Sequence, residues 1–374
     1  MANVEIKNPR FYCDLISSHI AKGITQNGEF DLNTSISNTQ AIQAGSESEL
    51  FDNRPLNQVS FDTSANTSNH VLIQIDTQFA GSNDSEGDRI NYVSILNHNI
   101  KSADCKVRIF GGNEASDIGA LDGSNADTSN INWSNQATTE IVNADNITVA
   151  SDNKSVVIQP AADGSTLFTF TASNMRYWAI QFEGTISDSS AAANDGTFDA
   201  STDLKIGCVQ LGCFYDMPHS PDITLARSIQ YDQTKILKSI GGQKYGLATN
   251  LGKFVSSTSR SPFLTSSQSA KDSIFYGRVS YDLAFSYISD IDLIPAIYTH
   301  PFFNNTSTQR TFIQDVWNIT LGNLLPFIFS VDNTSAGDNA ESELIFARFD
   351  SNTLDMKQIA HKLYNIRLKI VEEF

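Results

Sequence analysis

Over most of this 374-residue chain, apolar residues recur at every second position, and this alternation limits the chain to a mainly β fold. Clear examples are residues 71–79, 90–100, 105–112, 166–172, 175–184 and 278–289. Glycine, asparagine, aspartate and serine cluster between these runs, notably at 80–88, 111–130 and 186–203, and such residues favour loops. Strands of similar length separated by long polar loops predict antiparallel β-sandwiches.

A helical pattern replaces the alternation near residues 311–321. Phe312, Val316 and Ile319 recur at helical spacing, and Gly322 follows as a C-terminal cap. We expect Trp317 to lie buried between this helix, the only sizeable one, and a sheet. The chain is long for one core, and prolines at 218 and 221 bracket a short polar stretch. The sequence therefore predicts two β-rich domains, 1–218 with a core at about 31–215, and 219–374.

The chain is acidic, with 25 Lys and Arg residues against 42 Asp and Glu residues and a formal net charge of −17. Such a surface disfavours specific binding of nucleic acid. The sequence has no apolar run of about 18 residues and no leader pattern at its start, so we expect neither a membrane span nor secretion. The cysteines, each in an apolar run, are expected to be buried free thiols. They are Cys13, Cys105, Cys208 and Cys213.

The sequence contains no recognisable enzyme motif. Its six histidines lack zinc-binding spacing, and it has neither a phosphate-binding glycine loop nor a Gly-X-Ser-X-Gly element. His98, between Asn97 and Asn99, is interpreted as part of a sandwich rim rather than as a catalytic acid or base. We therefore predict no enzymatic activity and no required cofactor.

Three groups of residues are candidates for binding. Asp84, Glu86 and Asp88 alternate in a loop and offer oxygen ligands for Ca²⁺, with a solvated acidic loop as the alternative. Trp133 lies in a polar stretch and suits stacking on a sugar ring or docking a partner, with a plug over the end of the sandwich as the alternative. Phe302 and Phe303, in the apolar stretch 296–305, are candidates for a contact between subunits.

Three segments have the residue patterns of turns and core strands. They are LFDNRPLNQVSFDT (50–63), MRYWAIQF (175–182) and LKIGCVQLGCF (204–214). In this respect residues 31–215 resemble the galactose-binding-like (discoidin) jelly roll. Asn53 stands in the turn where that family commonly has glycine, and Phe61 stands in place of its tryptophan. The resemblance implies a β-sandwich whose loops at one end contact sugars or proteins, and it carries over no sugar-binding residue.

The segments VWNITLGN, LPFIFSV, FARFD and YNIRLKIVEEF follow one another near the C-terminus. In this order they resemble tail-tip and distal-tail proteins of tailed bacteriophages. The resemblance implies a tail-tube-like β-sandwich with one flanking α-helix, which forms a ring around the DNA channel. A homohexamer is expected, and tail-tube and tail-tip proteins are the expected partners.

From these patterns we expect a structural protein of the virion tail, in the baseplate region. An acidic inner surface of the expected ring suits the passage of DNA through the channel, because DNA does not adhere to it. The jelly roll is expected to face outward and to contact host surface glycans or anchor fibres. A carbohydrate-binding module of a cellular protein is the alternative, and a polysaccharide hydrolase is a third hypothesis.

Overall fold

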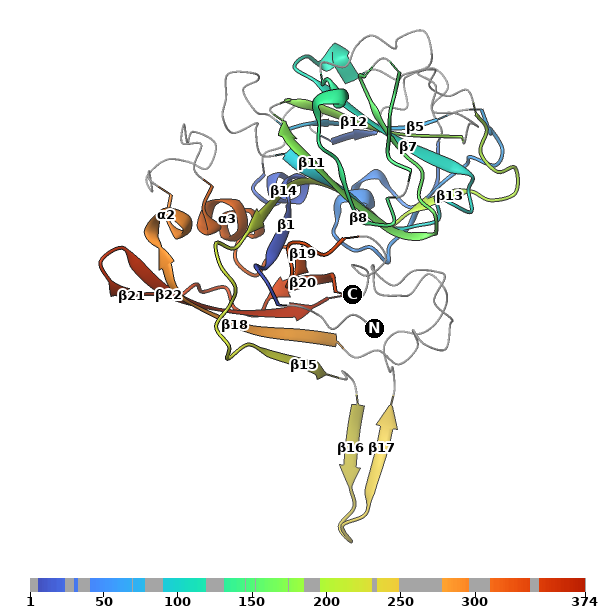
Figure 1. Ribbon diagram of the computed structural model, residues 1–374. Helices are drawn as coiled ribbons and strands as arrows, with labels where there is room; N and C mark the ends of the chain where they lie inside the picture. The colour runs from blue at the N-terminus through green and yellow to red at the C-terminus, as the bar shows by residue number, and fades with distance from the viewer. Residues whose placement is uncertain are drawn as a thin grey trace.

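The structure is a computed structural model, and it describes fourteen stretches of the chain. These are residues 6–23, 30–32, 41–68, 70–77, 90–118, 131–144, 146–151, 153–173, 175–184, 196–230, 234–248, 278–295, 310–336 and 343–373. The fold is mainly β and its sheets are antiparallel, which confirms the predicted fold class (Figure 1).

The largest sheet has eleven strands and runs through the whole molecule. Its strands, in spatial order, are β15 (Ala226–Gln230), β18 (Arg278–Ser289), β22 (Leu363–Glu372), β20 (Ile345–Phe349), β19 (Phe327–Ser330), β1 (Arg10–Asp14), β14 (Cys208–Asp216), β6 (Ile90–His98), β11 (Gly164–Ser173) and β8 (Thr139–Val142), with β21 (Met356–Ala360) paired to β22.

A six-stranded sheet packs against one end of the large sheet (Figure 1). Its order is β2 (Phe30–Leu32), β5 (Val71–Asp76), β12 (Tyr177–Gly184), β7 (Cys105–Gly112), β10 (Val156–Ile158) and β9 (Thr148–Val149). A three-stranded sheet contains β13 (Leu204–Ile206), β4 (Val59–Phe61) and β3 (Ile42–Ala44), and a separate hairpin contains β16 (Thr234–Lys238) and β17 (Lys244–Ala248).

The helical elements are short. They are α1 (Leu15–Ala21), α2 (Asp290–Leu293), a π-helical turn (Ile313–Trp317) continued by α3 (Asn318–Thr320), and 3-10 turns at Glu47–Phe51, Ala115–Ile118 and Trp133–Asn135. The helix expected near residues 311–321 is therefore present. A second short helix, α1, has seven residues and is capped by the Asp14 carboxylate. None of the described helices is long and apolar enough to cross a membrane.

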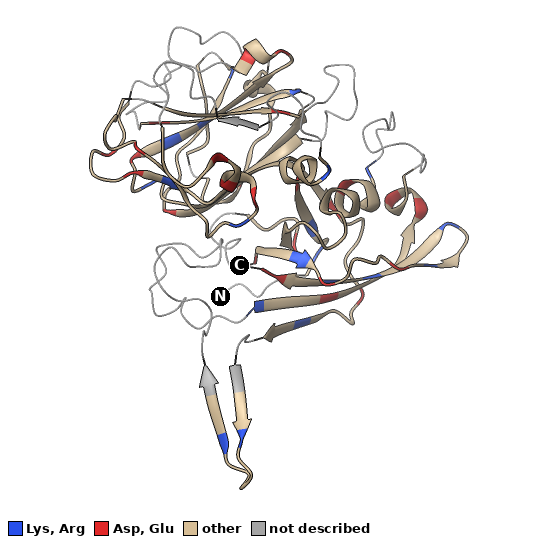
Figure 2. Cartoon of the chain, turned by 180° about the vertical axis from the view of Figure 1, so that it is seen from behind, with Lys and Arg blue, Asp and Glu red and all other residues tan. Residues whose placement is uncertain are grey.

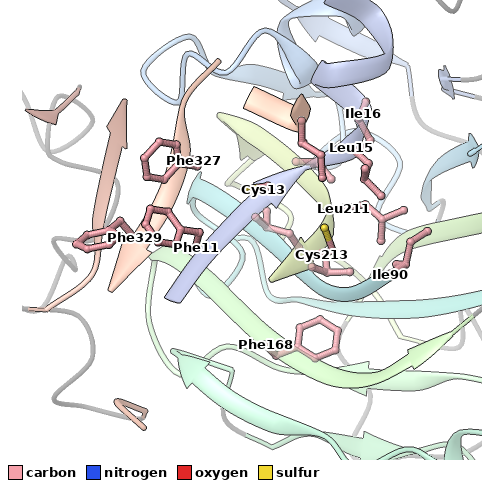
Figure 3. Close-up of a cluster of buried hydrophobic side chains, with 14 of the residues drawn as sticks. Phe11, Cys13, Leu15, Ile16, Ile90, Phe168, Leu211, Cys213, Phe327 and Phe329 are labelled. Atoms are coloured by element: carbon pink, nitrogen blue, oxygen red, sulfur yellow. The ribbon is translucent and has the colours of Figure 1, made fainter. Parts of the chain in front are cut away.

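The first strand joins the two halves of the large sheet. β1 pairs with β14 on one side and with β19 on the other, so residues from both sides of the predicted boundary share one ladder. The Phe11 ring packs 5.1 Å from that of Phe329 and 5.5 Å from that of Phe327, and Cys13 faces Cys213 in register (Figure 3). The division near residues 218–221 stays a prediction about which parts of the chain fold independently.

Trp317 is only partly buried and lies at the edge of the helix rather than beneath it. Its ring packs on that of Phe349 with centroids 5.1 Å apart. Phe312 and Val316, both fully buried, fill the space between helix and sheet instead. The π-helical turn explains the difference, because one extra residue per turn rotates the side chains that follow it.

Candidate functional site

A cleft of about 450 Å³ lies where the first half of the chain meets the end of the large sheet. One wall is the turn at residues 53–57, which belongs to the segment that resembles the discoidin turn. The opposite wall comes from the start of β18, the end of β20 and the last residues of β22. Segments separated by some three hundred residues therefore form one site.

Hydrogen bonds within the turn and two more distant residues, Asn97 and Gly207, hold the turn in place. Asp52 accepts hydrogen bonds from the Arg54 backbone at 2.7 Å and from the Asn57 amide at 3.2 Å. The Pro55 carbonyl accepts from the Asn97 amide at 2.7 Å. A Cβ on Gly207 would lie 2.1 Å from the same carbonyl oxygen, so only glycine permits this approach. The turn is thus a fixed wall of the cleft.

Asn53 occupies the position where the discoidin resemblance would place glycine. Its φ of 56° lies in the left-handed region, which asparagine tolerates better than other non-glycine residues. Its side-chain oxygen accepts a hydrogen bond from the Gln210 amide of β14 at 2.9 Å. Asn53 therefore provides both the conformation of glycine and an anchor that glycine lacks.

We expect Asn53→Ala to lower the free energy of unfolding by about 2–3 kcal/mol, because alanine resists a positive φ and leaves the Gln210 amide unpaired. Asn53→Gly keeps the backbone conformation and loses only the anchor, so its expected cost is about 1 kcal/mol. Urea denaturation of both variants measures the difference. Equal costs for the two variants would contradict the role of the backbone conformation.

The opposite wall carries charges of both signs. Arg348 forms a bidentate ion pair with Glu373 through Nε and Nη2, the Nη2 contact being 3.1 Å, and its Nη1 donates to the backbone carbonyl of Leu324. The buried Glu372 accepts from the Val279 backbone at 2.8 Å. Asp350 pairs with Lys369 at 2.8 Å, and Arg54 and Arg278 complete the charged lining.

The lining of this cleft is made largely of charged and amide groups, including the carboxylates of Asp350, Glu372 and Glu373. The described residues around the cleft supply guanidinium, carboxylate, amide and backbone groups, and none is a serine, cysteine, histidine or tyrosine. Such groups can recognise a polar partner through hydrogen bonds and ion pairs.

A second cleft, of about 370 Å³, crosses the large sheet beside β8, β11 and β1. Thr139, Thr169 and Thr171 place hydroxyl-bearing residues along one side of it. On the other side Arg10 lies over the Phe214 ring at 4.0 Å, and Asp216 holds its guanidinium with contacts of 2.6 and 2.8 Å. Hydroxyls and a cation beside an aromatic ring are groups that recognise sugars.

Trp133 is not the exposed binding residue that the polar surroundings suggested. Its side chain is 0% exposed and packs edge-on against Phe170, with ring centroids 5.3 Å apart. The alternative, a plug over the end of the sandwich, is the one the structure supports. The neighbouring polar residues serve the local turn, since the Asn132 side chain caps Ser134 at 3.1 Å.

The remaining candidates for binding lie outside the described residues. These are Asp84, Glu86 and Asp88 for Ca²⁺, and Phe302 and Phe303 for a subunit contact. Within the described part of the chain, no group of three or more His, Cys, Asp or Glu side chains is arranged to hold a metal ion.

His98 and the cysteines have the structural roles that the sequence indicated. His98 is buried, its Nδ1 accepts from the Ile100 backbone at 3.3 Å, and its Nε2 bonds to the Thr166 hydroxyl at 2.8 Å. Burial lowers the pKa of His98 to about 3, so the ring is neutral at physiological pH. All four cysteines are buried and none forms a disulfide, as predicted.

Comparison with known proteins finds no matching family model, no matching curated protein and no matching solved structure.

Proposed function

We propose that the protein is a structural component of a bacteriophage tail, of distal-tail or tail-tip type. In this proposal the part after Pro221 contributes to a ring and the preceding part faces outward. The observation that carries the proposal is the order of elements at residues 312–372. A helix with a left-handed Gly322 after it precedes β19, β20 and β22, in the order of the segments that resemble distal-tail proteins.

Two further features support this assignment. The acidic character of the chain suits a wall along which DNA passes. The described clefts carry side chains that can bind polar partners. The second cleft is the site that we assign to host surface glycans, because it combines hydroxyls with an arginine and a phenylalanine.

A ring is the expected state in solution. We expect mass photometry of the purified chain, alone and with neighbouring tail proteins, to show a homohexamer, and negative-stain images to show a ring with an acidic inner surface. A strictly monomeric or dimeric protein under every condition, with no ring in images of virions, would contradict the proposal.

The alternative is a carbohydrate-binding module of a cellular protein, and the second cleft is the observation that favours it. Binding to a glycan array by a monomer that never assembles would support this alternative. Replacing Thr169 with valine removes a hydroxyl with little change in volume, and should weaken glycan binding if the second cleft is the site.

A further inference from the structure

The hairpin β16–β17 stands apart from the body of the protein (Figure 1). It forms a two-stranded sheet of its own, and the described side chains along it are largely exposed. Ile236 is 68% exposed, Tyr245 is 51% exposed, and Ile240 at the turn is fully exposed. We call residues 234–248 the arm. Isolated hairpins are at best marginally stable in water, so an arm with this much exposed apolar surface is suited to an intermolecular contact.

The arm is also a basic element in an acidic chain. Its described side chains include Lys238 and Lys244 (Figure 2), and its sequence has no acidic residue, whereas the whole chain has a formal net charge of −17. Lys238 and Lys244 are direct partners in the ladder. Like charges opposite each other destabilise a strand pair, and an acidic surface placed over them removes this repulsion.

A complementary surface lies at the far end of β18. The last residue of β15, Gln230, pairs with Arg278 at the start of β18, and α2 follows the last residue of β18, Ser289. Tyr287 is 68% exposed and Ile291 is 55% exposed, and Asp290 and Asp292 flank Ile291 in the short helix α2. We call Tyr287, Asp290, Ile291 and Asp292 the α2 patch.

The backbone at Tyr287 adds an independent sign of function. Tyr287 has a φ of 65°, and it lies at an irregularity in the pairing of β18 with β22 between Phe285 and Ile288. A left-handed conformation is costly for an aromatic residue, and such strain concentrates at binding sites. Here the bulge turns the Tyr287 ring outward, next to α2, instead of continuing the alternation into the core.

We propose that the arm of one copy of this chain docks on the α2 patch of a second copy. In this contact the exposed apolar side chains of the arm pack on those of the α2 patch, and the arm lysines pair with Asp290 and Asp292. The arm lysines compete for Asp290 with Lys362, whose ammonium lies 3.8 Å from the Asp290 carboxylate. Two different surfaces take part, so the contact is head-to-tail and repeats until a ring closes. The inference rests on the proposed function, since it assigns the contacts of the proposed ring.

The test uses two variants that block opposite surfaces. The arm variant combines Lys238→Ser, Ile240→Ser and Lys244→Ser, all at exposed positions. The patch variant combines Tyr287→Gly with Ile291→Ser, where glycine removes the ring and also relieves the positive φ. Leu324→Ser, at an apolar residue 53% exposed outside both surfaces, is the matched control.

Each blocked variant is expected to self-associate at least about tenfold more weakly than the wild type in sedimentation-velocity measurements, while Leu324→Ser behaves as the wild type. An equimolar mixture of the two blocked variants is expected to form a dimer, because each retains the surface that the other lacks. Thermal unfolding of each variant alone verifies that it is folded.

Unchanged assembly of the arm variant, or a mixture that stays monomeric although both variants are folded, would overturn the inference and leave the proposed ring standing. A wild-type chain that never associates, even with its tail neighbours present, would overturn the proposed ring as well.

Discussion

Replacing Glu183 with glutamine is expected to lower the free energy of unfolding by about 3–5 kcal/mol, because it removes the buried negative charge with which two buried cations are paired. Glu183 accepts from Arg108 at 2.8 Å and lies 3.3 Å from the Lys106 ammonium, and all three side chains are almost completely buried. Glutamine keeps the volume and removes only the charge. Urea denaturation followed by fluorescence measures the loss.

The matched control removes the charges together. Glu183→Leu combined with Arg108→Met and Lys106→Met replaces the ionic cluster with apolar side chains of similar size. This triple variant is expected to be more stable than Glu183→Gln because the charges of the cluster are removed together, and to stay below the wild type because Ser155 and Gln181 lose their hydrogen bonds to the cluster. A loss under about 1 kcal/mol for Glu183→Gln alone would show that water or another anion reaches the two cations.

The strands were the most predictable part of the fold. β7 and β18 begin and end at the residues that the alternation indicates, although only β18 alternates in burial, since all residues of β7 are buried. The range 204–214 was expected as one strand and is divided into β13 and β14 at Gly207. That division depends on the close approach of the Pro55 carbonyl, which is a long-range contact that alternation does not encode.

The first cleft, the buried cations of β7 and the helix α1 were less predictable, each for a separate reason. The cleft joins the turn at 53–57 to residues 348–350 and 371–373, and only the pairing of distant strands brings them together. Lys106 and Arg108 alternate with apolar residues, a pattern typical of a solvent-facing side, yet both are buried. The helix α1 has only seven residues, too few for periodicity to reveal, and its signal is the capping Asp14.

Trp133 shows how local sequence can mislead about exposure. Its neighbours Asn132 and Ser134 are polar, but they bond to each other across a 3-10 turn and leave the indole to point into the core. The Trp133 backbone N–H donates to the Asn153 carbonyl at 2.7 Å, which ties this turn to the segment before β10. The indole therefore closes the space between the sheets beside Phe170 and Trp178.

We expect Trp133→Ala to lower the free energy of unfolding by about 3–5 kcal/mol, because it opens a cavity the size of an indole in a closely packed core. Trp133→Phe keeps an aromatic ring against Phe170, and its expected cost is about 1–2 kcal/mol. Tyr245→Ala, on the exposed arm, is the surface control and should change stability by less than about 0.5 kcal/mol.

Binding measurements separate this structural role from recognition of a ligand. At a temperature where Trp133→Phe is fully folded, its binding to glycans or host cells should equal that of the wild type, since the indole does not reach the surface. A stability cost below about 1 kcal/mol for Trp133→Ala, together with lost glycan binding, would instead place the indole at an exposed binding surface. Complete burial of the ring predicts the opposite results, which are a large stability cost for Trp133→Ala and unchanged binding by Trp133→Phe.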